Sequence, residues 1–298
     1  MSGNYFTIGI TDSQPIENDR LSSSRFTPFV SRDLKKRVDP YEVFPDAKSI
    51  IVVCVPYSTD VFFTNLSSLG VGLDYHKRVK NVLQTIANEL AVMHGSFMYK
   101  ILVDSPTLCE RSLAVRAGLG FFGKNGLVIS SEFGSRFNIG VMLTDILNPL
   151  GLALPACACE NIKVCPLDCD LCIKACPNGA IKKGEPLDAY RCISYLTQKE
   201  KLTTKEEKLL HGQLYGCDIC QNVCPKNATH ETSHANPREL LKLSDSEITE
   251  KFGHTAMNWK IKLLKRNAKI ATHTNSQSIS EHECHLLPSE NLCTIRAT

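Results

Sequence analysis

The sequence predicts a mixed α/β protein with an N-terminal α/β domain, a cysteine-rich second domain and a short helical C-terminus. Two observations support this prediction. Over the first part of the chain, β-branched apolar runs alternate with segments of helical periodicity. The composition then changes, and residues 157–225 are rich in cysteine and interrupted by proline and glycine. The expected domains are residues 1–150, 151–230 and 231–298.

The composition limits the class of protein. The 298 residues are 43% hydrophobic and 22% charged, as in globular proteins, and the net charge of +3 is too small to indicate nucleic-acid binding by itself. No apolar run approaches the ~20 residues of a membrane span, and no secretory signal begins the chain. We therefore expect a cytoplasmic protein without membrane association. In that reducing compartment, 14 cysteines favour metal ligands over disulfides.

The N-terminal region is expected to fold from alternating strands and helices. Strands are predicted at residues 49–55, 99–104, 126–130 and 137–144, and a helix at residues 107–119. Asp74 is the expected N-cap of another helix. The apolar face of that helix comprises Val79, Val82, Leu83, Ile86 and Leu90. Strand–helix alternation predicts a mainly parallel sheet with ligands beyond the C-terminal strand ends, where Asp104 lies.

A glycine-rich turn follows at the end of the helix predicted at residues 107–119. Gly118, Gly120 and Gly123 would let the backbone approach a flat ligand closely. Their spacing also fits a phosphate-binding loop, but such a loop opens a helix and this one follows a helix. We therefore favour a flat ligand.

Two cysteine motifs carry the strongest chemical signal. Cys165, Cys169, Cys172 and Cys176 form the first, Cys217, Cys220 and Cys224 form the second, and Cys192 lies between them. Proline follows Cys176 and Cys224, as in ferredoxin runs whose last cysteine binds the other cluster. This predicts a ferredoxin-like domain with two 4Fe–4S clusters. The predicted ligand sets are Cys165, Cys169, Cys172 and Cys224, and Cys176, Cys192, Cys217 and Cys220.

Two alternatives stay open for these motifs. The gap after Cys165 holds three residues instead of two, so Cys159 is an alternative first ligand. Paired cysteines also form structural zinc sites, although the repeated spacing followed by proline is more typical of iron–sulfur proteins.

Several short stretches of the chain form a recognisable series of motifs. They lie at residues 37–40, 74–76, 103–105, 117–125, 133–135, 191–197 and 216–220. In these stretches the chain resembles the epoxyqueuosine reductase family, and the resemblance covers residues 37–270.

The resemblance implies a cobalamin-dependent reductase that converts epoxyqueuosine to queuosine at the tRNA wobble position. The two clusters would pass electrons to the corrinoid, which is expected over the C-terminal edge of the sheet. An external low-potential donor such as flavodoxin or ferredoxin would supply them. The helical repeats of the family are expected to be truncated here, with a poorly ordered tail from residue 272.

The resemblance also assigns roles to residues. Asp104 matches the proton donor, and an opening epoxide needs an acid because it leaves an alkoxide. An aspartic acid at pH 7 then needs a pKa raised above ~3.9, as burial against a corrin would cause. The alternative is that Asp104 caps the helix predicted from residue 107. The expected cobalamin contacts are Arg37, His76, Asp104, Gly123, Lys124, Asn125, Ser135, Ile193 and Ser194.

Three questions stay open at this point. Tyr75 and His76 could be cofactor contacts or features of a first helical turn. The substrate could be a small molecule, as in reductive dehalogenases. The chain could also be a ferredoxin-like electron carrier, in which case the α/β domain would lack a cofactor site.

Overall fold

The computed structural model describes residues 5–16, 27–152 and 164–274. They form two compact units, neither of which is continuous in sequence. Unit 1 comprises residues 1–57, 74–190 and 220–228, and unit 2 comprises residues 58–73, 191–219 and 229–298. The division into three consecutive domains stays a prediction. The predicted poorly ordered tail lies outside the described residues from position 275 onward.

The sheet of unit 1 is antiparallel, so the prediction of a mainly parallel sheet is wrong. Its order is β1-β2-β6-β3, and each neighbouring pair is antiparallel. The strands are β1 (Thr7–Asp12), β2 (Ser49–Pro56), β3 (Tyr99–Val103) and β6 (Phe137–Thr144). Because β2 and β3 both oppose β6, they run parallel to each other. The two parallel strands are joined through the helix between them in sequence, but β6 lies between them in the sheet.

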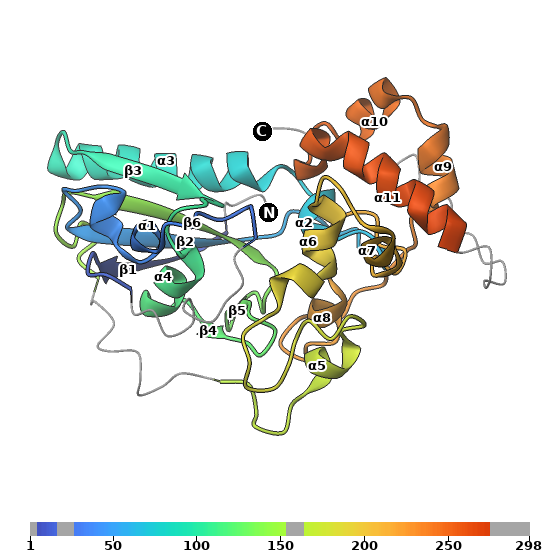
Figure 1. Cartoon of the computed structure of the whole chain (residues 1–298). Helices are drawn as coiled ribbons and strands as arrows, with labels where there is room; N and C mark the ends of the chain where they lie inside the picture. Colours follow the sequence, from blue (N-terminus) through green and yellow to red (C-terminus); the bar gives the residue numbers. More distant parts are fainter. Residues whose placement is uncertain (1–4, 17–26, 153–163, 275–298) are drawn as a thin grey trace. The chain divides into compact units, whose positions relative to one another are not determined.

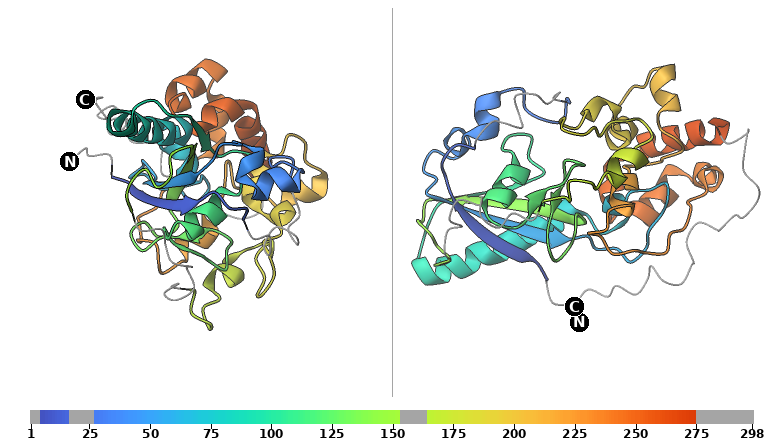
Figure 2. Two further views of the ribbon diagram at one scale, coloured as in Figure 1. Left: turned by 90° about the vertical axis from the view of Figure 1, so that its left-hand side faces the viewer. Right: turned by 90° about the horizontal axis from the view of Figure 1, so that it is seen from below.

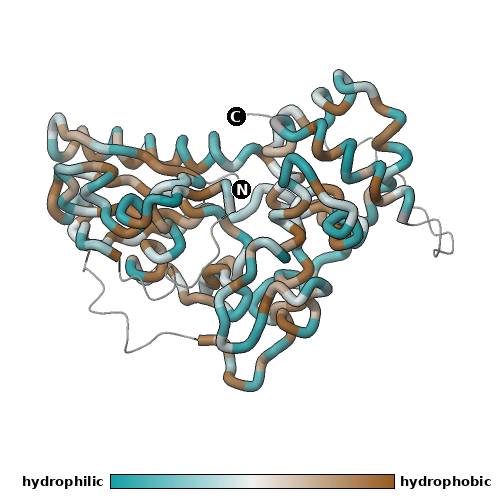
Figure 3. Tube along the Cα trace, viewed as in Figure 1, coloured by the Kyte–Doolittle hydropathy of each residue, from teal (hydrophilic) through white to brown (hydrophobic). Residues whose placement is uncertain are grey.

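Helices cover both faces of this sheet (Figure 1 and Figure 2). On one face lies α3 (Tyr75–His94), whose N-cap is Asp74 and whose five predicted apolar residues are all buried. On the other face lies α4 (Glu110–Arg116), with Leu113 and Ala114 fully buried against the strands. The short α1 (Leu34–Val38) and η1 (Pro40–Glu42) precede β2. Figure 3 shows that hydrophobic residues are frequent along the strands of this sheet.

Two smaller elements of unit 1 carry predicted motifs. Of the predicted glycine-rich turn, Gly118 and Gly120 precede β4 (Phe121–Phe122), and Gly123 begins the loop that joins β4 to β5 (Val128–Ile129) in an antiparallel hairpin. A short helix, α5 (Leu171–Ala175), contains Cys172.

Unit 2 is helical. Its helices include α2 (Ser68–Val71), α6 (Ile193–Gln198), α7 (Thr204–Lys208), α9 (Pro237–Lys242), α10 (Asp245–Phe252) and α11 (Ile261–Thr274). The predicted helical C-terminus is present, and in it η3 (Ala256–Lys260) is followed by α11. The helix α8 (Ile219–Asn222) begins at the last residue of a unit 2 segment and continues into unit 1. In the described parts of the chain, every helix is too short or too polar to span a bilayer.

We predict that Gly140→Ala destabilises unit 1. A Cβ at Gly140 of β6 would lie 2.3 Å from Cγ1 of Val79 and 2.9 Å from Cδ1 of Leu83, so α3 could not keep its close approach to the sheet. Overpacking of this kind costs about 1–3 kcal/mol in the free energy of unfolding. The measurement is urea denaturation followed by circular dichroism.

A double variant tests the proposed cause. Val79→Ala alone should also destabilise the protein, because it leaves a cavity under α3. Together with Gly140→Ala it should cost less than the sum of the two single changes. Additive losses would show that the contact with Val79 is not the source of the strain.

Candidate functional site

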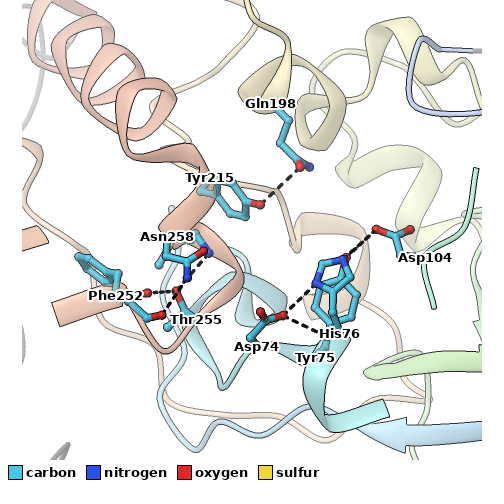
Figure 4. Close-up of polar contacts among 11 residues, drawn as sticks. Asp74, Tyr75, His76, Asp104, Gln198, Tyr215, Phe252, Thr255 and Asn258 are labelled. Carbon is cyan, nitrogen blue, oxygen red and sulfur yellow. Dashed lines mark hydrogen bonds and ion pairs between the residues drawn. The ribbon is translucent and has the colours of Figure 1, made fainter. Parts of the chain in front are cut away.

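Polar side chains meet where α3 begins and β3 ends (Figure 4). The buried carboxylate of Asp74 accepts the backbone N–H of His76 at 3.0 Å and contacts Nδ1 of His76 at 2.9 Å. The hydroxyl of Tyr75 donates to Oδ2 of Asp104 at 2.6 Å, and Nε2 of His76 lies 3.8 Å from the same oxygen. Tyr75 and His76 are therefore first-turn residues that also face Asp104. This is the C-terminal edge of β2 and β3, where the sequence predicted a ligand.

Asp104 does not cap a helix, so that alternative is wrong. The following helix, α4, begins at Glu110 with Cys109 as its N-cap. Asp104 has a φ of 49°, a left-handed conformation that is unfavourable for a residue with a Cβ. Its side chain is 67% exposed. The turn thus presents a carboxyl group at the sheet edge.

The turn after Asp104 is held by two side chains from elsewhere in unit 1. Oε1 of Glu110 accepts the backbone N–H of Ser105 at 2.9 Å, and the backbone of Asp104 also donates to this carboxyl group. The guanidinium of Arg37 donates to the carbonyl of Pro106 at 3.3 Å. Arg37 is buried, and its predicted contact with a cofactor stays a prediction. In the structure it supports the turn that carries Asp104.

Glu110 is a site residue that the sequence analysis missed. Burial, and secondarily the negative charge of Asp104, raise the pKa of Glu110 to about 8. The group is therefore mostly neutral at pH 7. The sequence signal for Glu110 is an acidic residue in the first turn of a helix, six positions after the proposed proton donor. This signal is weak, because acidic residues are common at helix N-termini, where they interact favourably with the helix dipole.

Four thiols of the first predicted ligand set lie near one another in unit 1. Burial, then the charges of Cys165, Cys169 and Cys224, raise the pKa of the Cys172 thiol. Cys224 thus comes close to the first motif despite its distance in sequence. Within the described residues, no three Cys, His, Asp or Glu side chains are gathered closely enough to hold a single metal ion. Cys159, the alternative first ligand, lies outside the described residues.

The segment that carries Cys224 is fastened by Ser135. Oγ of Ser135 donates to Oε1 of Gln221 at 3.0 Å, and its backbone N–H donates to Oδ1 of Asn227 at 2.7 Å. Gly134 has a φ of 58°, and a Cβ there would lie 2.5 Å from the carbonyl oxygen of Lys226. The buried Ser135, predicted to contact cobalamin, in this structure holds the Cys224 segment.

Lys124 and Asn125 lie in the β4–β5 turn and also make contacts within the protein. Nζ of Lys124 donates to the carbonyls of Pro166, Leu167 and Cys169 at 2.8, 3.1 and 2.7 Å. The buried side chain of Asn125 accepts the N–H of Leu127 at 3.2 Å, within the turn. Gly123, buried beside Asn125, donates its N–H to the carbonyl of Leu127 at 2.8 Å. The turn therefore reaches the first cysteine motif.

The second predicted ligand set draws on both units. Cys176 and Cys220 belong to unit 1, and Cys192 and Cys217 belong to unit 2. These four assignments stay predictions. Ile193 and Ser194, the other expected cobalamin contacts, open α6 in unit 2 directly after Cys192.

Within unit 2, the loop around Cys217 is held on both sides. The N–H of Gly216 donates to Oγ1 of Thr197 at 2.9 Å. The buried carboxylate of Asp218 accepts hydrogen bonds from the hydroxyl of Ser67 and from the backbone N–H of Ser68, both at 2.7 Å. A further contact in this unit joins the hydroxyl of Tyr215 to Gln198 (Figure 4). The Cys217 loop is thus fixed by hydrogen bonds of unit 2 itself.

We predict that Glu110 gives the protein a pH-dependent stability. Its pKa is about 8 in the folded protein against 4.5 without the fold, so the folded state retains a proton that the unfolded state releases between these values. Stability is highest below pH 4.5 on this account and falls as the pH rises toward 8. Glu110→Gln should therefore gain stability relative to wild type across this range. The measurement is the melting temperature of both proteins from pH 5 to pH 8.5.

A control separates this effect from general charge removal. Glu89 is an exposed carboxylate on α3, so Glu89→Gln should follow the wild-type pH profile. A difference between Glu110→Gln and wild type that stays constant from pH 5 to pH 8.5 would contradict the prediction.

Two family models match the chain. The model described as "Epoxyqueuosine reductase QueG, DUF1730" matches residues 37–105, which include Arg37 and Asp104. The model described as "4Fe-4S double cluster binding domain" matches residues 162–227, which include all eight predicted cysteine ligands and exclude Cys159. The chain therefore has the segment that binds two 4Fe–4S clusters.

Full-length relatives extend this similarity to nearly the whole chain. Epoxyqueuosine reductase of Bacillus subtilis is 32% identical over 98% of this chain and 81% of its own length, and that of Listeria monocytogenes is 32% identical over 88% and 75%. The solved structure of the Streptococcus thermophilus enzyme has a TM-score of 0.75 at 29% identity, covering 89% of this chain and 76% of that one.

Another solved structure contains an epoxyqueuosine reductase with an epoxyqueuosine-modified tRNA stem loop. It matches with a TM-score of 0.74 at 30% identity, over 89% of this chain and 76% of that one. Three findings lead to one assignment. They are the turn that carries Asp104, the four thiols around Cys172, and these similarities. The chain belongs to the epoxyqueuosine reductase family of oxidoreductases.

Proposed function

We propose that this protein reduces epoxyqueuosine in tRNA to queuosine, in the cytoplasm, with two 4Fe–4S clusters and cobalamin as cofactors. The observation that supports this most is the presentation of Asp104 by Tyr75 at the C-terminal edge of the sheet. The relative with an epoxyqueuosine-modified tRNA stem loop supports the substrate. An external low-potential donor, of the flavodoxin or ferredoxin class, supplies the electrons.

The residues present fit these cofactors. The four thiols around Cys172 give one complete set of ligands for a 4Fe–4S cluster. At the sheet edge, the side chains of Asp104 and His76 are 67% and 44% exposed, so they are accessible to a large flat ligand. Bound cobalamin supplies the low-potential reducing chemistry, and the clusters supply its electrons one at a time.

The protein's own residues handle protons. Reduction of an epoxide to an alkene and water takes up two electrons and two protons. The oxygen of the opened epoxide becomes an alkoxide, and the carboxyl group of Asp104 is the donor placed to protonate it. Tyr75 orients this group through its hydroxyl, while Glu110 and Arg37 hold the backbone of the turn. A bound corrinoid would also exclude bulk water from Asp104.

We predict that Asp104→Asn loses turnover but keeps its cofactors. Asparagine has nearly the shape of aspartic acid but cannot protonate an alkoxide, so the loss should fall on kcat. Removal of a general acid typically costs ~10²–10⁴-fold. The assay is formation of queuosine in epoxyqueuosine-containing tRNA by the reduced, cobalamin-loaded protein. Low salt is used because tRNA affinity falls as salt rises.

The control is Asp46→Asn, an exposed aspartate that precedes β2 at the other edge of the sheet. It should turn over like wild type. Wild-type rates in Asp104→Asn would show that the proton comes from elsewhere. If wild type reduces its bound cobalamin but forms no queuosine, tRNA is the wrong substrate and a small molecule takes its place.

We predict that Cys172→Ala loses one cluster and retains the other. Anaerobically reconstituted wild type should hold about eight iron ions, and the variant should hold about half as many because only one ligand set is incomplete. Iron and sulfide analysis measures this. Cys54→Ala is the matched control, since Cys54 is buried in β2 and should leave the iron content unchanged. Stoichiometric zinc in place of iron in wild type would contradict the cluster assignment.

A further inference from the structure

The loop that connects Cys165 to Cys169 has almost no apolar anchorage of its own. Val164 is 64% exposed and Leu167 is 90% exposed, and Pro166 and Asp168 are exposed as well. One backbone hydrogen bond, from the N–H of Cys169 to the carbonyl of Pro166 at 3.1 Å, closes its turn. Hydrophobic burial therefore cannot fix the shape of this loop, although the loop must present two thiolates in defined positions.

The ammonium group of Lys124 supplies the missing anchorage. It is within 3.1 Å of three carbonyl oxygens of this loop, those of Pro166, Leu167 and Cys169. An ammonium group has three N–H donors and no acceptor, so these three bonds use its full capacity. Hydrogen bonds from a charged donor are also stronger than neutral ones. One side chain thus sets the relative positions of three backbone groups in the loop.

The β4–β5 hairpin holds Lys124 in place for this role. The N–H of Gly123 donates to the carbonyl of Leu127 at 2.8 Å, and the N–H of Gly126 donates to that of Gly123 at 2.9 Å. Gly126 has a φ of 77°, which favours glycine. Arg111 fixes the carbonyl of Gly126 at 2.6 Å. The hairpin tip is therefore held by hydrogen bonds that do not involve the cysteine motifs.

The charge of Lys124 has an electrostatic consequence. A cluster with four thiolate ligands becomes more negative when it accepts an electron, and a nearby cation stabilises the reduced form. Lys174 lies two residues after Cys172 in the sequence, but it is exposed and pairs with Asp170 at 3.0 Å. Lys124 contacts the backbone of a ligand residue and Lys174 does not share this contact, so the effect of Lys124 on the cluster should be larger.

We propose that Lys124 is a positioning residue of the first cluster, which shapes the loop of Cys165 and Cys169 and favours the reduced state. The inference deepens the proposed function and rests on its first ligand set. The sequence had suggested that Lys124 contacts cobalamin. Its three hydrogen bonds direct its charge to the iron–sulfur side of unit 1, and its contact with cobalamin stays a prediction.

The test compares Lys124→Met, Lys124→Arg and Lys174→Met in the full chain after anaerobic reconstitution. The readouts are iron content and the reduction potential of the first cluster, followed by EPR. The first cluster is identified as the signal absent from Cys172→Ala. Lys124→Met should lose iron from this cluster and shift its potential to a more negative value. Lys124→Arg keeps the charge and should keep a potential close to wild type, although its planar group fits the three carbonyls less well.

Lys174→Met should match wild type in both measurements. A wild-type potential in Lys124→Met, at any iron content, would overturn the proposal. The melting temperature of each iron-free variant verifies that it folds. Neither measurement uses cobalamin or tRNA, so a failure to form queuosine would leave this inference standing. A wild-type protein that lacks the first cluster would overturn this proposal together with the ligand set on which it rests.

Discussion

The predicted first ligand set would impose the main constraint on unit 1. Its thiols come from a motif around Cys172 and from Cys224, and between them the chain passes through a segment of unit 2. Residues 220–228 must therefore return to unit 1 and stay there. Ser135 and the neighbouring Arg136 secure that return, since Arg136 donates to the carbonyl of Ala228 and to the side chain of Asn222, both at 2.8 Å. The short loop before β6 thus holds the Cys224 segment, although that segment comes from far along the chain.

The turn that carries Asp104 is also fixed by side chains from elsewhere in unit 1. A residue with a Cβ in a left-handed conformation costs about 1–3 kcal/mol and persists only where its surroundings fix it. Here they do so from three directions: Tyr75 holds the carboxyl group, Glu110 holds the backbone N–H groups, and Arg37 holds the carbonyl two residues later. The left-handed conformation places the carboxyl group of Asp104 beyond the end of β3. A conformation suited to capping a helix would not place it there. Burial also raises the pKa of Glu110 to about 8, so this supporting carboxyl group is mostly neutral at pH 7.

Local structure could be predicted from the sequence, whereas strand order could not. Asp74 as an N-cap, the buried face of α3 and the full extent of β6 follow from capping chemistry and periodicity. These patterns show which side chains face a core but not which strand lies beside which. The position of β6 between β2 and β3 therefore could not be predicted from the sequence. The helix predicted at residues 107–119 begins only at Glu110, because Ser105 and Thr107 hydrogen-bond to each other and to local backbone in a turn that competes with helix.

The same limit explains why the cysteine ligands could be proposed from sequence more securely than the cobalamin contacts. A thiolate ligand has a specific spacing, but glycine next to a polar residue indicates only that backbone or hydrogen-bonding groups approach closely. Such a pattern serves a cofactor and a structural loop equally well. In the structure, Asn125 and Ser135 are buried and hydrogen-bonded within the protein, while Asp104 and His76 remain accessible. Whether a polar group is already engaged by the fold is a property of tertiary structure. It is this property that separates the residues that shape the scaffold from those available to a ligand.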